Sequence, residues 1–139
     1  MTEAQAISLP SGWRLPTKAD AEKLLTYLGA TGSGSNGIDG DATVSIKLKS
    51  KSDWTYTQGN NSSGFNAFPA GDLNGNTYEG INLATTFWTS SADQYSDQYV
   101  LIIANLPDGP NIEDAAGMDY IPTSSIGNFK TSIRFVKDN

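Results

Sequence analysis

The feature that most constrains the fold is a continuous apolar run in the second half of the chain. Residues 99–104 read YVLIIA, with apolar side chains at both odd and even positions. Because successive residues of a strand point to opposite faces, this run predicts a central strand that is buried on both sides. A chain of 139 residues, of which 37% are hydrophobic, has enough apolar material for one core around it. We therefore expect a single domain over residues 1–139.

Three other segments carry β patterns. Residues 43–49 and residues 131–136 alternate apolar and polar side chains, and residues 82–90 place large apolar side chains among threonines. Lys47 and Lys49 lie on the polar side of the first segment. We expect them to face solvent and protect an edge strand from pairing with other chains, with an anion site as the less favoured alternative.

One amphipathic helix is expected over residues 18–28. Thr17 is placed to cap its first turn, and Asp20 three residues later completes a capping-box pattern. Gly29 follows the last apolar position and suits a left-handed C-cap. The expected apolar face consists of Ala21, Leu24, Leu25 and Leu28.

The remaining segments are rich in Gly, Asn, Ser and Pro. Residues 29–40 suggest a flexible connection, while residues 53–80 and residues 105–129 suggest two long, ordered, irregular loops. Together these elements predict an α+β fold with one main N-terminal helix, a small antiparallel sheet and long ordered loops. Loops of this length in a compact domain usually carry function or their own packing.

The composition excludes several kinds of chemistry. The chain has no histidine and no cysteine, which removes Ser-His-Asp and Cys-His nucleophiles, thiolate or imidazole metal sites, and disulfides. Lys and Arg total 9 against 15 Asp and Glu, which argues against nucleic acid as a partner. No run is long and apolar enough to span a bilayer, and residues 1–6 lack the basic start and apolar stretch of a signal peptide.

The second long loop and its approach are the expected binding face. Tyrosine offers a large contact area at low entropic cost, and Asn and Asp offer adaptable hydrogen bonds. Trp54 is a further candidate, because its polar neighbours suit an exposed ring that stacks on a sugar, whereas Trp13 and Trp88 are expected in the core and Arg14 is expected to pair with a carboxylate. The candidate ligand-binding residues are Trp54, Tyr95, Tyr99, Asp108, Asn111, Asp114, Asp119 and Tyr120.

No cofactor or catalytic group is predicted. Calcium is possible in principle because it takes oxygen ligands, but the EF-hand-like start at residues 72–76 places Leu83 where a bidentate Glu is needed. Asp39 and Asp41 form another acidic pair in the Gly-rich connection. A carboxylate-dependent glycoside hydrolase would need two converging acids, and the spacing of Glu79, Glu113, Asp114 and Asp119 selects no pair.

Several short motifs occur in an ordered series. They are GWRLPT at 12–17, LKS at 48–50 with a following Trp54, SGFNAFPAG at 63–71, FWTSS at 87–91 and SIRFVKD at 132–138. Taken together, this series resembles the Fibrobacter succinogenes major paralogous domain family, and the match covers nearly the whole chain from Leu9 onward.

This resemblance implies a C-type-lectin-like fold, a bacterial cell-surface or secreted location, often as a lipoprotein, and no catalytic activity. We therefore expect a non-catalytic, adhesin-like module that recognises a glycan or protein ligand, with a passive structural module of a larger lipoprotein or pilus-like assembly as the alternative. The chain departs from the family pattern at Phe135, which replaces the usual Cys, and before GWRLPT, where only residues 2–8 remain to form a first strand. Residues 93–127 fit the pattern poorly and are expected to carry what is individual to this protein.

Overall fold

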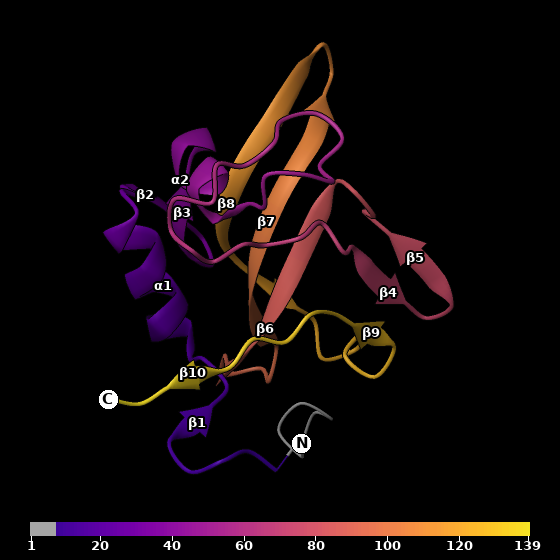
Figure 1. The fold of residues 1–139 in the computed structure, drawn as a ribbon. Coiled ribbons are helices and arrows are strands. Elements are labelled where there is room, and N and C mark those ends of the chain that lie inside the picture. Colours follow the sequence, from indigo (N-terminus) through magenta and orange to yellow (C-terminus); the bar gives the residue numbers. More distant parts are fainter. Residues whose placement is uncertain (1–7) are drawn as a thin grey trace.

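The structure, a computed structural model, describes residues 8–139 (Figure 1). The start of the chain, compared above with a signal peptide, and almost all of the strand expected over residues 2–8 lie outside this range. The elements in chain order are β1 (Trp13–Arg14), α1 (Lys18–Tyr27), β2 (Gly32–Gly34), β3 (Gly37–Gly40), α2 (Ala42–Leu48), β4 (Asp72–Asn74), β5 (Thr77–Glu79), β6 (Ala84–Ala92), β7 (Gln98–Asp108), β8 (Asn111–Ile121), β9 (Phe129–Lys130) and β10 (Val136–Lys137).

The main sheet has five antiparallel strands in the order β2-β3-β8-β7-β6. The prediction of a central strand at residues 99–104 is confirmed, since β7 contains this run and pairs with β8 on one side and β6 on the other. Leu101 and Ile103 are almost fully buried, whereas Ile102 and Ala104 are only partly buried. One face of the sheet is therefore more open than the other.

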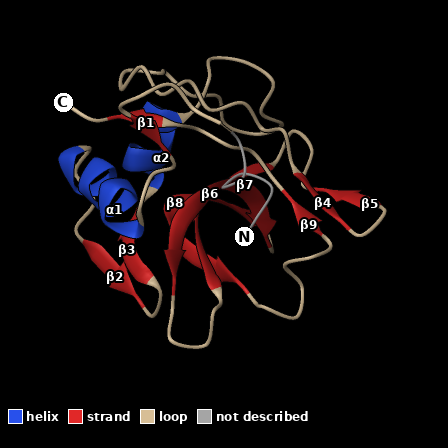
Figure 2. Ribbon diagram, turned by 90° about the horizontal axis from the view of Figure 1, so that it is seen from below, coloured by secondary structure: helices blue, strands red, loops and turns tan. Residues whose placement is uncertain are grey.

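The two helices cover one face of the main sheet, and a second sheet lies beyond its β6 edge (Figure 2). The three-stranded sheet β5-β4-β9 lies beside β6, away from the helices. The core between helices and sheet includes Leu25 of α1, Leu48 of α2, Trp54, Ile103 of β7 and Met118 of β8. Mostly β-structure with two short helices is compatible with the expected α+β class.

Helix α1 forms as its sequence predicts. The Thr17 side chain accepts a hydrogen bond from the Asp20 amide at 3.2 Å, and Asp20 Oδ2 accepts one from the Thr17 amide at 2.7 Å. This capping box satisfies two amides that the first helical turn leaves without partners. Gly29 has a φ of +107°, so the expected left-handed residue after the helix is confirmed.

The strand predicted over residues 43–49 is wrong, because this segment forms helix α2. Asp41 caps the helix by accepting hydrogen bonds from the amides of Thr43 and Val44. Val44 and Leu48 are four residues apart, so the helix places them on one buried face, although they also satisfy the two-residue period of a strand. The expectation that Lys49 faces solvent fails with the strand, since its side chain is fully buried.

Two segments expected to be irregular are ordered into strands. Residues 29–40 contain the β2–β3 hairpin instead of a flexible connection, and residues 105–129 contain all of β8 instead of a long loop. Pro107 is the last residue but one of β7, Pro110 lies in the turn between β7 and β8, and Pro122 follows the last residue of β8. Proline is tolerated at these strand ends, so it marks the limits of the hairpin.

The remaining predictions are met in part. The strand expected at residues 82–90 is confirmed as β6, and residues 53–80 are largely irregular, apart from the β4–β5 hairpin. Residues 131–136 do not form the expected strand. They contain an isolated bridge at Ser132 and the first residue of β10, because the intervening backbone turns Arg134 toward Phe65.

Candidate functional site

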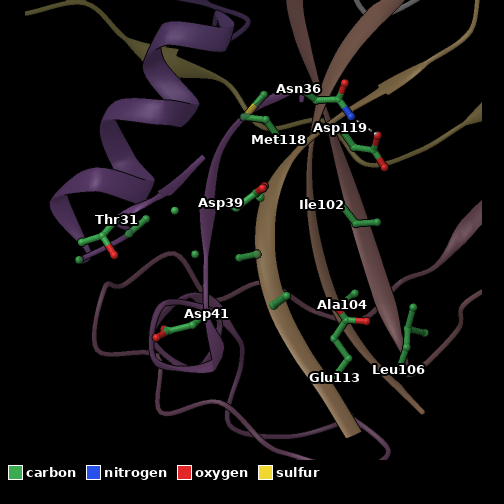
Figure 3. A pocket seen from close by; sticks show the side chains of 17 residues that line it. Thr31, Asn36, Asp39, Asp41, Ile102, Ala104, Leu106, Glu113, Met118 and Asp119 are labelled. Atoms are coloured by element: carbon green, nitrogen blue, oxygen red, sulfur yellow. Dashed lines mark hydrogen bonds between the residues drawn. The ribbon is translucent and has the colours of Figure 1, made fainter. Parts of the chain in front are cut away.

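A groove of about 670 Å³ lies on the open face of the main sheet (Figure 3). Ile102, Ala104 and Ala115 belong to its floor. These residues alternate along β7 and β8 with the core residues Ile103 and Ala116, which places them on the face opposite the helices. One rim comes from the residues that follow α1 and from the β2–β3 hairpin.

The groove is acidic. Asp39, Asp41, Glu113 and Asp119 line it, and among the described residues no lysine or arginine belongs to its lining. None of the four carboxylates forms a salt bridge within residues 8–139. Asp119 accepts a hydrogen bond from Asn36 Nδ2 at 3.1 Å, which ties the β2–β3 turn to β8. The groove therefore combines an apolar floor with uncompensated negative charge.

Two glycines make room for the central carboxylate. A Cβ atom at Gly34 or at Gly117 would overlap the Asp39 carboxylate, which lies against both backbones. Asp39 pairs with Gly117 across the β3–β8 ladder, so the two residues point to the same face of the sheet. Gly34 of the hairpin and Gly117 of β8 thus leave room for one acidic side chain.

The acidic groups are spread along the groove instead of meeting at one point. In Figure 3, Asp119 lies near one end, Glu113 near the other, and Asp39 between them. Among the side chains that the structure describes, no cluster of three or more acidic groups is arranged to hold a metal ion. Such a surface accepts hydrogen bonds from a chain of donors and attracts positive charge.

A family model described as the Fibrobacter succinogenes major domain matches residues 1–137. The chain belongs to this family. The resemblance predicted from the ordered motifs is thereby confirmed. No curated protein and no solved structure matched the chain.

In this family member, the GWRLPT and SIRFVKD motifs meet in space. Strand β1 pairs with β10, and Arg14 forms ion pairs with Asp20 and Asp138. The expected carboxylate partner of Arg14 is confirmed, and the Arg14 guanidinium holds the pKa of Asp20 well below its ordinary value. The prediction that Trp13 is a core residue is wrong, since 43% of it is exposed, whereas Trp88 is buried as expected.

The LKS motif of the family supplies a buried ion pair. Lys49 Nζ lies 2.9 and 3.0 Å from the two carboxylate oxygens of Asp114 and donates to the Thr57 carbonyl at 2.6 Å. Burial lowers the pKa of Lys49, although Asp114 acts against this shift. Ser45 donates a further hydrogen bond to Asp114. Asp114 is therefore engaged in the interior and is not available to a ligand.

The interpretation of Trp54 as an exposed sugar platform is also wrong. Only 2% of Trp54 is exposed, and its indole Nε1 donates to Ser50 Oγ at 3.2 Å. Lys49 Nζ lies 4.9 Å from the centre of its ring. The polar residues that precede Trp54 turn the chain so that its ring enters the core, which their polarity alone did not indicate.

The other predicted binding residues are dispersed. Tyr95 is exposed in the β6–β7 turn and Asn111 is exposed at the start of β8. Tyr99 is half-buried beneath Lys18, while its cross-strand partner Tyr120 is partly exposed. Asp108 ends β7, and its side chain lies outside the described part of the structure. Of the predicted residues whose side chains the structure describes, only Asp119 lines the groove.

The sequence shows Asp39 and Asp41 as one acidic pair and Glu113 with Asp119 among the acids that a hydrolase could use, but no local pattern joins the two sets. Nothing in the sequence analysis above singles out Asn36. The signal that could have found the site was Gly34-Ser35-Asn36-Gly37, whose residue types are typical of tight turns, because a turn at Ser35-Asn36 pairs Gly34 with Gly37 and brings Asp39 onto the sheet.

Proposed function

We propose that this chain is a non-catalytic recognition module of a bacterial cell-surface or secreted protein, adhesin-like, and that it binds a basic segment of a protein ligand in the acidic groove. The observation that carries this proposal is the set of four carboxylates without a lysine or arginine in the same lining. A cationic side chain placed there would meet unpaired negative charge beside an apolar floor.

The lining of the groove and the charge of the chain distinguish the two ligand classes expected from the sequence, a glycan and a protein. The groove lining contains no aromatic residue, so it offers no ring on which a sugar would stack. The formal net charge of −6 favours approach of a basic partner over a neutral one. These features support a protein ligand ahead of a glycan.

The location and the finer fold belong to the same proposal. The cell-surface or secreted setting, including a lipoprotein context, rests on the family resemblance. We also propose that the chain has the C-type-lectin-like fold, in which a compact sheet supports a variable binding face. No helix within residues 8–139 has the length and apolar character needed to cross a bilayer.

The test is a binding measurement with defined probes. We expect a lysine-rich peptide of about eight residues to bind the purified chain, with affinity that falls as salt rises from about 50 to 500 mM because screening weakens the attraction. A variant carrying Asp39→Asn, Glu113→Gln and Asp119→Asn should bind about tenfold or more weakly. A glycan array tests the competing possibility that the ligand is a glycan.

The matched control is a variant with acidic side chains neutralised away from the groove. Asp53→Asn and Glu79→Gln change exposed carboxylates that do not line it and should leave peptide binding almost unchanged. Equal weakening of peptide binding in both variants would show that affinity depends only on the net charge of the chain. That result would contradict a binding site in the groove. If the peptide does not bind and the array identifies a glycan that does, the proposal of a basic protein ligand is wrong and the ligand is a glycan.

A further inference from the structure

A second cavity, separate from the acidic groove, lies between α1, β6 and the C-terminal segment. It has a volume of about 270 Å³ and a largely apolar wall that includes Leu24, Phe87, Trp88 and Phe135. Arg134 lines the same cavity. An arginine in an apolar wall is unusual, because a charged group loses hydration there unless a partner compensates it.

Arg134 is held in position by aromatic and backbone contacts. Its guanidinium lies 4.2 Å from the centre of the Phe65 ring and 5.7 Å from that of Phe87. One of its nitrogens donates to the Phe65 carbonyl. The contacts with the two rings and with the Phe65 carbonyl hold the guanidinium in place and leave its remaining N–H groups to donate elsewhere.

No carboxylate neutralises this guanidinium within residues 8–139. Asp20 also lines the cavity, but its two oxygens are bound by Arg14, by the Thr17 amide and by the Thr17 hydroxyl. Burial lowers the pKa of Arg134, but the guanidinium keeps its charge at neutral pH. The cavity therefore presents one positive group that the described protein does not pair.

From this arrangement we infer that the cavity binds a small monocarboxylate with an apolar body. The guanidinium would accept the carboxylate through charge-assisted hydrogen bonds, and the apolar walls would bury the rest of the molecule. Because one water occupies about 30 Å³ in the liquid, the cavity corresponds to about nine non-hydrogen atoms. This is the size of benzoate, and hexanoate is a comparable aliphatic anion.

The first experiment titrates the whole chain with benzoate, followed by the amide and indole signals in NMR spectra. We expect saturable shifts of the Trp88 indole and the Phe65 and Leu24 amides, while the indole of Trp54 does not move. Benzamide, which has the same shape without the charge, should bind about tenfold more weakly. Equal affinity for benzamide, or shifts confined to the acidic groove, would overturn the inference.

The second experiment changes the arginine. Arg134→Gln should weaken benzoate binding about tenfold or more, and Arg134→Lys should weaken it less, because lysine keeps the charge without the planar fork. Lys137→Gln removes an exposed cation three residues away that does not line the cavity, and it should bind like the wild type. If Arg134→Gln does not fold, the comparison of benzoate with benzamide on the wild-type chain still decides the question. Unchanged binding by a folded Arg134→Gln would refute the site, and none of these results depends on peptide binding in the groove.

Discussion

Lys49 and Asp114 show how a single buried pair joins parts of the chain that are far apart in sequence. Lys49 follows α2 and Asp114 lies in β8, and each is close to fully buried. Burying either charge alone is costly because it loses hydration, so each side chain depends on the other. The pair therefore fixes how the second helix sits on the sheet.

The first prediction concerns this pair. Asp114→Asn should lower the free energy of unfolding by about 3–5 kcal/mol, because it leaves a buried ammonium without its counter-charge. Urea unfolding measures the change. Asp53→Asn, which alters an exposed carboxylate, should change stability by about 0.5 kcal/mol or less. Replacing both partners with apolar side chains, in Lys49→Met with Asp114→Leu, should recover most of the loss. A single variant as stable as the wild type would contradict the role given to the pair.

The second prediction tests the glycine contact beneath Asp39. Gly117→Ala introduces a methyl group that overlaps the Asp39 carboxylate, which is the end of a flexible side chain and can rotate away. We expect stability to change by about 1 kcal/mol or less, while the affinity for the lysine-rich peptide falls by several-fold, about 0.5–1 kcal/mol. Titration calorimetry and urea unfolding on the same variant separate the two effects. Loss of stability without loss of binding would contradict a binding role for Asp39.

At the scale of elements, the two helices differ in how far their sequences predict them. Helix α1 has a capping box, a full apolar face and a terminal glycine, so three independent signals agree. Helix α2 has seven residues, and its apolar positions fit a strand as well as a helix. The Asp41 cap and the burial of Lys49 against Asp114 decide the outcome, and the latter is a contact that no local pattern contains.

The strands likewise show where local sequence patterns stop predicting the structure. The apolar run of β7 was predictable because both faces are apolar, whereas β8 was hidden because its open face carries Asp119, Gly117 and Glu113. Those residues look like loop composition until pairing with β7 reveals which side each one occupies. The candidate site was missed for the same reason, since its acids come from the β2–β3 hairpin and from β8, which only the sheet brings together.

The third prediction concerns the start of α1 and its pH dependence. The Arg14 guanidinium lowers the pKa of Asp20 in the folded chain below the unfolded value of about 3.9. The ionised carboxylate therefore stabilises the fold above about pH 4, and this contribution is lost as the pH falls. Asp20→Asn should cost about 1 kcal/mol or less at neutral pH, because the ion pair is partly exposed.

The difference in stability between wild type and Asp20→Asn should shrink between about pH 5 and pH 2, as urea unfolding at each pH would show. Asp53→Asn again serves as the control, because this side chain is exposed and, within residues 8–139, hydrogen-bonds only to the neighbouring Ser52. A difference that stays constant over this range would mean that the charge of Asp20 contributes nothing.

At the scale of the whole molecule, the two proposed sites use opposite charges on separate surfaces. The groove over β7 and β8 carries four carboxylates, while the cavity beside α1 carries Arg134. The β1–β10 pairing brings the GWRLPT and SIRFVKD motifs together next to the cavity, so both motifs help to form the wall of the cavity. The family motifs thus supply part of the core and most of the wall of the cavity, whereas the groove is made from segments outside the motifs.

The last prediction tests whether residues 1–139 behave as one domain. One cluster of buried side chains joins α1, α2, β7, β8 and Trp54, so none of these elements should unfold while the others remain packed. We expect a single urea transition in which tryptophan fluorescence and far-UV circular dichroism coincide. Trp13→Phe removes the partly exposed tryptophan, so the fluorescence then reports the buried Trp54 and Trp88. Two separate transitions, or a fluorescence midpoint well below that of the circular dichroism, would show that the core around Trp54 unfolds independently and that the chain is not one cooperative unit.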